Sequence, residues 1–497
     1  MTVITNTSDE AQNVQMGRSQ HQKLGLLLGP LVAICLLLLS PPEQLSQAGW
    51  ATAAIGIWMA IWWSTEAVPV SVTALLPLVT FELLGILDLK AAAAPYANPT
   101  IYLFMGGFMI ATAMQKCGLH RRIAFFILSF VSAGARSIIL GFMLVSALLS
   151  MWMTNTSTTM MLLPIALSII STLETDEPEL SDTQRRHFQL SLLLGVAYAA
   201  TIGGMATLVG TPPNAFLAGF MNETYGLQIG FAQWMLVGLP LAVIMLPLAW
   251  WMLTRWVYPV NFKTPEEVKQ RLAQQRKSLG AMTKAEARVG AIFTLVALAW
   301  MTRPLIEGAF GIEGLSDAGI AMFAALSLFV ISAGKSEGGA LMNWEDTRDI
   351  PWGVLILFGG GLSLAAAVSD TGLAEWMGQS LVSLNTYGLL VLIICAATMV
   401  IFLTEMTSNL ATTATFLPVV AAIAVEIGGA PISLAVPVAL AASCAFMLPV
   451  ATPPNAIVFS SGLISIPQMA RAGLLLNLLG IVLVSAVAYF IAPMVFA

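Results

Sequence analysis

The feature that most constrains this chain is a set of long stretches that contain no charged residue. Asp, Glu, Lys and Arg are all absent between Lys23 and Glu43, between Arg136 and Glu174, between Glu223 and Arg255, and between Glu426 and Arg471. A membrane-spanning helix needs ~20 apolar residues, so each stretch has room for one span or a pair of spans. Apolar residues make up 58% of the sequence and charged residues only 9%, which excludes an ordinary soluble protein. The sequence therefore predicts an all-α polytopic membrane protein.

The distribution of basic residues predicts how the chain is oriented in the membrane. Loops on the cytoplasmic side carry an excess of Lys and Arg. With the N-terminus inside, only Lys90 and Arg303 of the 21 Lys and Arg fall outside. We therefore expect a plasma-membrane (bacterial inner-membrane) protein with a cytoplasmic N-terminus and an external C-terminus. The expected apolar segments are 24–40, 48–64, 67–87, 100–116, 137–173, 189–222, 233–253, 289–302, 317–334, 352–369, 376–425, 432–459 and 472–495.

Two of these segments are too long for a single span, and each has ends of one charge type. Block 137–173 has residues of cytoplasmic type at both ends, whereas block 376–425 has no Lys or Arg at either end. Each block is therefore expected to form a re-entrant hairpin that enters and leaves the membrane on one side. The charge pattern predicts that the two hairpins enter from opposite faces.

The two halves of the chain resemble each other at a constant offset of 254 residues. FMGGFMIATAMQKCGL (104–119) parallels LFGGGLSLAAAVSDTGL (357–373), and GTPPN (210–214) recurs as ATPPN (451–455) once a polar insert in the first half is allowed for. Inverted repeats with interrupted apolar segments are typical of secondary transporters whose site lies near the membrane midplane. The positions matched at this offset are Gly106 and Gly360, Ser150 and Thr404, Asn155 and Asn409, and Pro164 and Pro418.

Each expected hairpin contains a polar tip followed by a helical run, TNTSTTMMLLP (154–164) and SNLATTATFLP (408–418). Small hydroxyl and amide residues cap helix N-termini, where free backbone N–H groups and the positive end of the helix dipole can face an anion. The oxygen atoms of the same residues can coordinate Na⁺. For one hairpin, the alternative is that Asn and Thr simply turn a buried chain. The duplication at one offset favours a binding site.

The two TPPN motifs are helix breakers inside apolar segments. Two successive prolines remove two backbone donors and favour an extended residue before them. Carbonyl groups freed at membrane depth must be buried in protein or line a cavity, although a plain proline kink is the alternative. Glu66 and Glu405 are the acidic residues nearest to apolar segments, where a carboxylate is a functional candidate. The alternative for both is a position at the membrane boundary, and the sequence leaves their roles open.

Several other chemistries lack the residues they require. The three histidines lie in polar segments, which excludes a zinc cluster and a histidine-based catalytic triad. The four cysteines stand singly in apolar surroundings, with no CxxC pair. No basic domain is present that could hold a nucleic acid. We therefore expect neither an enzyme nor a bound cofactor, and no nucleic acid among the partners.

The residues quoted above, together with WWSTEAVPVSVTALLPL (62–78) and GLHRRIA (118–124), resemble the divalent-anion/sodium symporter family. This family includes bacterial and animal di- and tricarboxylate transporters, and the resemblance covers about residues 24 to 497. It implies a homodimer whose protomers each have 11 spans and two opposed hairpins. It also implies an elevator mechanism, in which a transport domain carrying the hairpins and broken helices moves against a static scaffold domain.

The resemblance also implies a set of site residues. The first sodium site would use Ser150, Thr154, Asn155 and Gly210, and the second would use Thr404, Thr407, Asn409 and Ala451. The substrate would meet Asn155, Thr156, Thr211, Asn409, Leu410, Thr452 and Pro453. Na⁺ would be the coupling ion, and it would supply the positive charge that the two hairpins lack, because neither block contains Lys or Arg.

Domain boundaries follow from the resemblance and the repeat. They are 1–23 for a cytoplasmic N-terminal tail, 24–135 for the scaffold helices and 136–260 for the transport-domain hairpin and broken helix of the first repeat, 261–288 for a cytoplasmic linker, and 289–376 and 377–497 for the corresponding parts of the second repeat. Leu410 departs from the family pattern, which has Thr at this position, and this change leaves the preferred anion open.

Sodium-coupled import of a di- or tricarboxylate of the succinate, malate, fumarate or citrate class is the leading hypothesis. Electroneutral carboxylate exchange and sulfate-type symport on the same fold are the alternatives, and a membrane-embedded enzyme or channel is a third class. An enzyme lacks a nucleophile–base pair here, and a channel would pass single-channel currents. The sequence does not determine which anion is preferred or how many Na⁺ ions accompany it.

Overall fold

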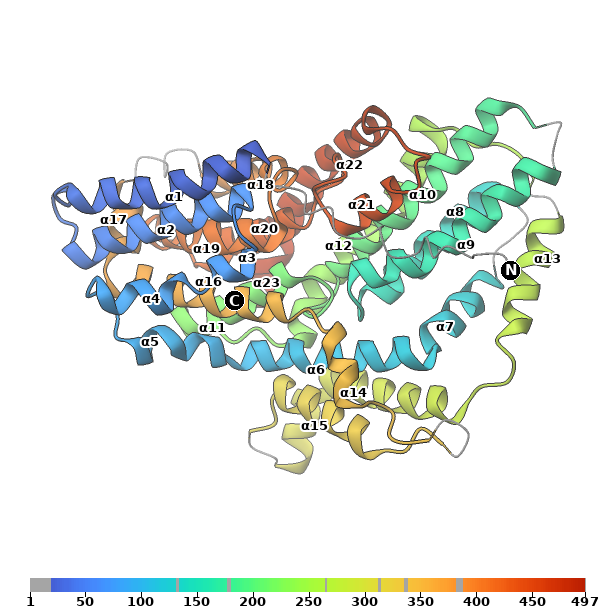
Figure 1. Cartoon of the computed structure of the whole chain (residues 1–497), viewed down its shortest axis with the longest axis horizontal. Helices are drawn as coiled ribbons and strands as arrows, with labels where there is room; N and C mark the ends of the chain where they lie inside the picture. Colours follow the sequence, from blue (N-terminus) through green and yellow to red (C-terminus); the bar gives the residue numbers. More distant parts are fainter. Residues whose placement is uncertain are drawn as a thin grey trace, which may run out of the picture.

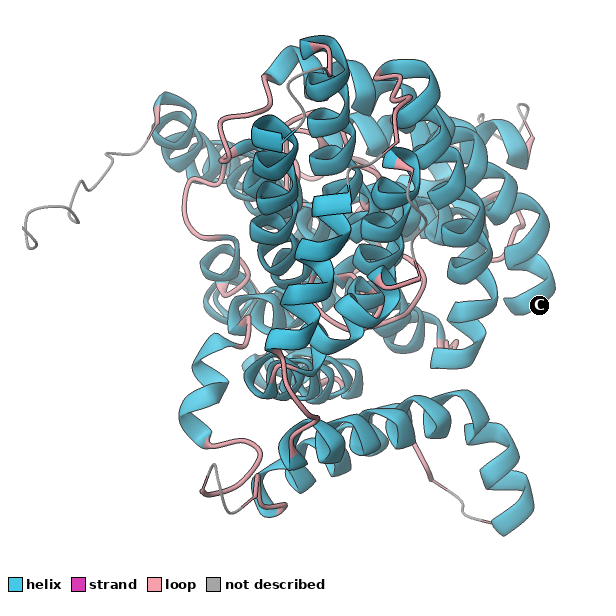
Figure 2. Cartoon of the chain, turned by 90° about the vertical axis from the view of Figure 1, so that its right-hand side faces the viewer, coloured by secondary structure: helices cyan, strands magenta, loops and turns pink. Residues whose placement is uncertain are grey.

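A computed structural model describes residues 19–130, 134–176, 180–263, 266–311, 314–334, 338–380 and 388–496. In these segments the chain is helical, with no strand and only two isolated β-bridges, Gly134 with Lys263 and Ser332 with Ala340. The turned view in Figure 2 shows helices joined by short loops throughout the described chain. The all-α prediction is confirmed. Of the predicted N-terminal tail, residues 1–18 lie outside the described residues, and helix α1 already begins at Gln20.

Among its described residues, the first half of the chain contains thirteen α-helices and two other helical turns. They are α1 (Gln20–Leu38), α2 (Gln47–Thr65), α3 (Val70–Thr73), α4 (Leu76–Leu83), α5 (Leu89–Ala93), a 3₁₀ turn (Ala94–Ala97), α6 (Pro99–Cys117), α7 (Leu119–Leu128), α8 (Ala135–Ser150), α9 (Asn155–Asp176), α10 (Asp182–Gly204), α11 (Pro212–Tyr225), α12 (Phe231–Trp251), a π-helical stretch (Met252–Val257) and α13 (Glu266–Ser278). 

The second half repeats much of this order. Its helices are α14 (Lys284–Phe310), α15 (Asp317–Val330), a 3₁₀ turn (Trp344–Asp349), α16 (Trp352–Asp370), α17 (Leu373–Ser380), α18 (Leu389–Thr404), α19 (Asn409–Glu426), α20 (Ile432–Ala442), α21 (Pro453–Phe459), α22 (Ile466–Ala486), a π-helical stretch (Val487–Ile491) and α23 (Ala492–Phe496). In Figure 1, α14 and α15 lie along one edge of the bundle against α6, which both of them contact.

Seven helical segments of the described chain are long and apolar enough to cross a membrane. Five shorter apolar segments accompany them. Most expected spans coincide with observed helices to within a few residues, such as 48–64 with α2, 100–116 with α6 and 352–369 with α16. The number and composition of these helices are those of a polytopic membrane protein.

The expected span 67–87 is not one helix. It divides into α3 and α4, with the chain turning between them. Pro69 precedes α3 and Pro77 occupies the first turn of α4, where the missing N–H of proline costs no helical hydrogen bond.

Helix α10 lies in the tightly packed interior of the bundle. Residues 188–204 of this helix are all buried, so it is enclosed on every side, as expected for a helix that is apolar all round. Helix α1 is the opposite case, with Leu24, Leu31 and Leu38 all more than half exposed on its outer face. At Gly203 a side chain would collide with the backbone of Ala147, so glycine allows α10 to approach α8 closely.

The two halves of the chain interlock at their centres. Helix α21 of the second half packs against α9 and α10 of the first, and helix α11 of the first half packs against α19 and α20 of the second. Figure 1 shows α21 beside α9 and α10. Because each half inserts a short helix into the other, the four helical interruptions meet in one place.

Candidate functional site

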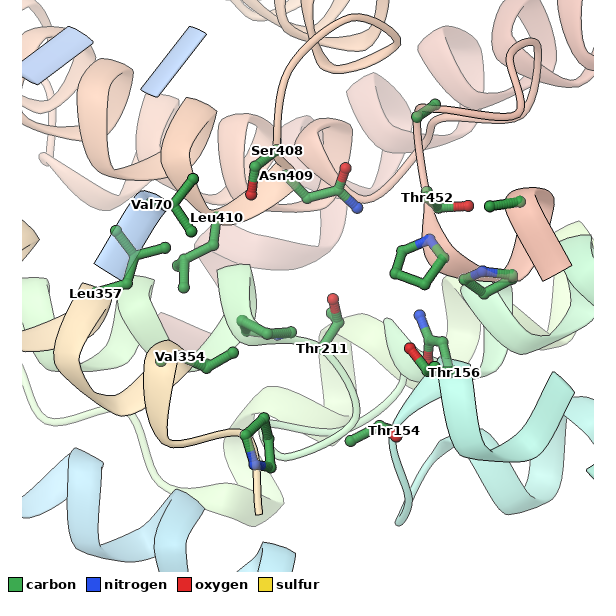
Figure 3. A pocket seen from close by; sticks show the side chains of 18 of the residues that line it. Val70, Thr154, Thr156, Thr211, Val354, Leu357, Ser408, Asn409, Leu410 and Thr452 are labelled. Atoms are coloured by element: carbon green, nitrogen blue, oxygen red, sulfur yellow. The ribbon is translucent and has the colours of Figure 1, made fainter. Parts of the chain in front are cut away.

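A cavity of about 1510 Å³ lies where the four interruptions meet. Its wall includes the two polar tips, at 154–157 and 407–410, and the two TPPN breaks, at 210–213 and 451–454. Figure 3 shows Asn409 and Thr452 facing Thr211 and Thr156 across this space. Small-ligand pockets are typically ~300–1,000 Å³, so the cavity exceeds what a small anion needs. It continues beyond the tips as a vestibule that reaches the first turn of α1 and the end of α6.

The first tip is a four-residue turn between α8 and α9, and it is organised around Asn155. The hydroxyl of Ser150 donates to the Oδ1 atom of Asn155. The backbone N–H of Ser157 donates to Oγ1 of Thr154 at 3.2 Å, as expected for a residue capping a helix N-terminus. Ser150 therefore fixes the side chain of Asn155, and the N-terminal end of α9 faces the cavity.

The second tip repeats this arrangement around Asn409. The hydroxyl of Thr404 lies 2.8 Å from Oδ1 of Asn409 and 3.0 Å from the carbonyl oxygen of Ala442, and these two acceptors share its one hydrogen. The hydroxyls of Thr407 and Thr412 lie 2.6 Å apart. The pairing of Ser150 with Asn155 and of Thr404 with Asn409 gives the repeat a geometric counterpart, because the same bond recurs at the same offset.

The first TPPN break is held together by Asn214. Its Nδ2 atom donates to three backbone carbonyls, those of Gly204 at 3.3 Å, Met205 at 3.2 Å and Thr207 at 2.8 Å. The hydroxyl of Thr207 accepts the N–H of Gly210 at 3.0 Å. Non-helical backbone between α10 and α11 thereby finds partners inside the protein, which is the condition for such backbone at membrane depth.

The second break uses Asn455 in the same way. Its Nδ2 atom donates to the carbonyls of Ala445 at 3.2 Å and Leu448 at 3.0 Å. The Oδ1 atoms of Asn214 and Asn455 are both buried, and neither has a hydrogen-bond partner among the described residues. These two asparagines are site-building residues that the sequence analysis missed, since it assigned roles only to Thr and Pro of the motif. Their signal was the recurrence of the complete TPPN motif.

Most residues that the sequence analysis assigned to the substrate and sodium sites line this cavity. Ser150 and Thr404 do not line it; they are fully buried behind the two asparagines that they hold. Glu66 lines the vestibule, whereas Glu405 is buried outside the cavity wall. Eleven of the named residues line it: Thr154, Asn155, Thr156, Gly210, Thr211, Thr407, Asn409, Leu410, Ala451, Thr452 and Pro453.

Leu410 lines the cavity but has only 4% of its surface exposed. In Figure 3 its side chain points away from Thr452 toward Val70 and Leu357, which also line this part of the cavity. The wall beside Leu410 is therefore apolar, whereas the matching position of the first tip carries the hydroxyl of Thr156.

The electrostatics of the cavity favour an anion accompanied by small cations. The N-terminal ends of α9, α11 and α19 line it and present positive dipole ends. Lys116, in the vestibule, is already paired with Asp346 at 2.6 Å. Burial opposes ionisation of Asp346, but bonds from the N–H of Asn343 and from Lys116 lower its pKa below the ordinary value. Around the tips, positive charge beyond the dipole ends must come from solution.

A transition-metal site does not fit this cavity. In the part of the chain that the structure describes, no group of three or more His, Cys, Asp or Glu side chains could hold a metal ion. The groups at the tips are hydroxyls, amide oxygens and backbone carbonyls. Such neutral oxygens suit a hard cation of low charge.

Comparison with known proteins identifies relatives along almost the full length of the chain. A family described as the sodium:sulfate symporter transmembrane region matches residues 20–496. The sodium-dependent dicarboxylate transporter SdcS of Staphylococcus saprophyticus is 41% identical over 478 residues, which cover 95% of this chain and 92% of the relative. The protein of the same name from Staphylococcus aureus is 41% identical over 480 residues, covering 96% and 92%. The chain therefore belongs to the sodium:sulfate symporter family, as its tips and TPPN motifs had indicated.

Proposed function

We propose that this protein is a secondary transporter that couples the import of a di- or tricarboxylate to Na⁺. The observation that carries the proposal is the meeting of two Asn-centred tips and two TPPN breaks around one cavity, with no basic side chain at the tips. Such a site binds a dianion only when cations accompany it, which makes coupling to Na⁺ a consequence of its chemistry. Relatives named sodium-dependent dicarboxylate transporters support the same substrate class.

Each half of the site has a distinct role in this proposal. Carboxylate groups of the substrate face the helix N-termini at the two tips, with Thr156, Thr211, Thr452 and Pro453 closing around them. The sodium ions bind behind the tips, where oxygens converge. The first site uses Ser150, Thr154, Asn155 and the carbonyl of Gly210, and the second uses Thr404, Thr407, Asn409 and the carbonyl of Ala451.

Transport in this proposal is an elevator movement. The units 136–260 and 377–497 form the mobile transport domain, and 24–135 and 289–376 form a scaffold with 11 spans in total and a homodimer contact. The two tips belong to re-entrant hairpins of opposite orientation. In this proposal the N-terminus is inside, and the vestibule that reaches α1 and α6 then opens to the cytoplasm, as in an inward-facing state.

Purified protein in liposomes tests the proposal. We expect uptake of labelled succinate to require an inward Na⁺ gradient and to increase when the interior is made negative. Each net charge that moves inward gains ~2.3 kcal/mol per 100 mV. Uptake that is indifferent to membrane potential and needs an internal carboxylate would indicate exchange. Competition by sulfate stronger than that by succinate or citrate would move the substrate to the sulfate class, and failure of all these anions to be taken up would refute the proposal.

A further inference from the structure

Glu405 is a buried carboxylate that the proposed substrate and sodium sites do not use. It follows the last residue of α18 and stands next to Thr404, whose hydroxyl holds Asn409. Only 3% of its surface is exposed. None of the ion pairs observed among the described residues includes it. A buried carboxylate without a basic partner is costly unless other donors satisfy it.

Backbone and amide donors satisfy this carboxylate almost completely. Oε1 accepts the N–H of Phe446 at 2.8 Å and of Met447 at 2.9 Å, and Oε2 accepts the N–H of Met447 at 3.1 Å and of Leu448 at 3.0 Å. Asn477 of α22 adds a bond from Nδ2 to Oε1 at 2.7 Å. Three successive N–H groups directed at one carboxylate form a nest that stabilises its ionised form.

The hydrogen bonds of the segment that Glu405 holds extend to the proposed second sodium site. The carbonyl of Leu448, whose N–H binds the carboxylate, accepts the N–H of Ala451 at 3.2 Å and Nδ2 of Asn455 at 3.0 Å. The Glu405 carboxylate therefore holds residues 446–448, and Asn455 holds the same irregular segment between α20 and the second TPPN motif from its other end. The backbone carbonyl of Ala451, at the end of this segment, is one of the ligands assigned to the second sodium site.

The first repeat has no such charge. The residue at the matching offset is Met151, whose backbone carbonyl accepts the hydroxyl of Thr207 at 2.5 Å. Besides the bonds of Asn214 and Asn455, a neutral bond thus links the first break to its tip, whereas a carboxylate links the second break to its tip. The two sodium sites therefore differ in local charge, although their tips are alike.

We propose that Glu405 is a positioning residue for the second sodium site and that it acts in two ways. This inference rests on the function proposed above. The carboxylate of Glu405 holds the segment 446–451 in the conformation that presents the carbonyl of Ala451. Its negative charge, adjacent to Thr404, raises the affinity of that site for Na⁺. The first sodium site has neither contribution.

The test is Glu405→Gln, which preserves size but removes the charge and one acceptor. We expect the Na⁺ concentration for half-maximal succinate uptake to rise at least about tenfold, as for loss of hydrogen bonds to a charged group. The succinate KM at saturating Na⁺ should change little. Glu405→Asp keeps the charge on a shorter side chain and should recover part of the Na⁺ affinity. Glu426→Gln is the matched control, because it removes the same charge from the far end of α19.

A second readout separates positioning from a purely structural role. Stabilisation of the detergent-solubilised protein by Na⁺ without substrate should require more Na⁺ in Glu405→Gln than in the wild type. If Glu405→Gln does not fold, Asn477→Ala removes a single bond and should shift Na⁺ dependence in the same direction by a few-fold. Unchanged Na⁺ dependence in these variants, or an equal shift in Glu426→Gln, would overturn the inference. Wild-type protein without Na⁺-dependent uptake would instead refute the proposed function.

Discussion

The two halves of the site share one design but are fastened to the rest of the protein in different ways. Trp152 of the first tip stacks on Phe231 and Trp300, with ring centroids 5.8 and 6.4 Å away, and meets Phe293 edge-on at 5.1 Å. The residue at the matching position of the second tip is Met406, which is 75% exposed and lines the cavity. Trp152 docks the first tip on α12 and α14, whereas Met406 of the second tip has no such aromatic contact among the described residues and faces the cavity.

This difference shows that the binding groups are repeated in the two halves, whereas the residues that pack around the tips are not. The bonds from Ser150 to Asn155 and from Thr404 to Asn409 recur, and so do the bonds made by the two TPPN asparagines. The groups that anchor the tips do not recur. Equivalent substitutions in the two halves should therefore have equal effects on binding and unequal effects on stability.

The largest expected effect concerns the two central asparagines. Asn155→Ala and Asn409→Ala should each reduce Na⁺-coupled uptake at least about 100-fold, because each removes contacts to a sodium ion and to a carboxylate, and each bond to a charged group is worth ~1.5–3 kcal/mol. Uptake in liposomes, normalised to reconstituted protein, measures the loss. A normal elution profile and melting temperature would show that the variant folds. Undiminished uptake in either variant would remove that tip from the site.

A second prediction compares the anchoring of the tips. Trp152→Ala should destabilise the protein by ~3–5 kcal/mol, because it removes a large side chain from a packed aromatic cluster. Met406→Ala should change stability by less than ~0.5 kcal/mol, since most of its surface is exposed. Thermal or denaturant unfolding in detergent measures both. Equal destabilisation by the two substitutions would show that the second tip is packed as firmly as the first.

The third prediction concerns a tip position at which the first tip carries a hydroxyl and the second does not. Thr156 of the first tip corresponds to Leu410 of the second, and Leu cannot donate a hydrogen bond to a second carboxylate. Leu410→Thr should therefore strengthen the binding of small C4-dicarboxylates by about tenfold, the lower end of the range for such a bond, because apolar contacts are lost as well. Na⁺ dependence should remain.

Competition of succinate, citrate and sulfate against labelled substrate measures this change. Thr156→Leu is the reciprocal variant and should weaken succinate. A Leu410→Thr protein with the wild-type order of anions would show that Leu410 only packs against Val70 and Leu357 and does not contact the substrate.

The sequence predicted the helical class, most of the apolar helices and the residues that meet in the cavity, because charge-free stretches and a repeat at one offset are properties of the sequence itself. It did not predict that 67–87 divides into two helices, since composition cannot distinguish a span from two short helices with prolines at their starts. It also left Glu405 unassigned. The donors that satisfy this carboxylate lie about 40 and 70 residues away in the sequence, so no local pattern contains them.

The exchange of short helices between the halves also has a consequence for how the chain is made. Helix α21, which packs against α9 and α10, begins at Pro453, more than 200 residues after α11 ends at Tyr225. At synthesis rates of ~5–20 residues per second, the first half waits for roughly 10–50 s before α21 emerges from the ribosome. During that time the surfaces of α9 and α10 that pack against α21 are uncovered. Neither half is thus a complete folding unit, and the early half must persist in the bilayer as an unfinished intermediate until the late half arrives.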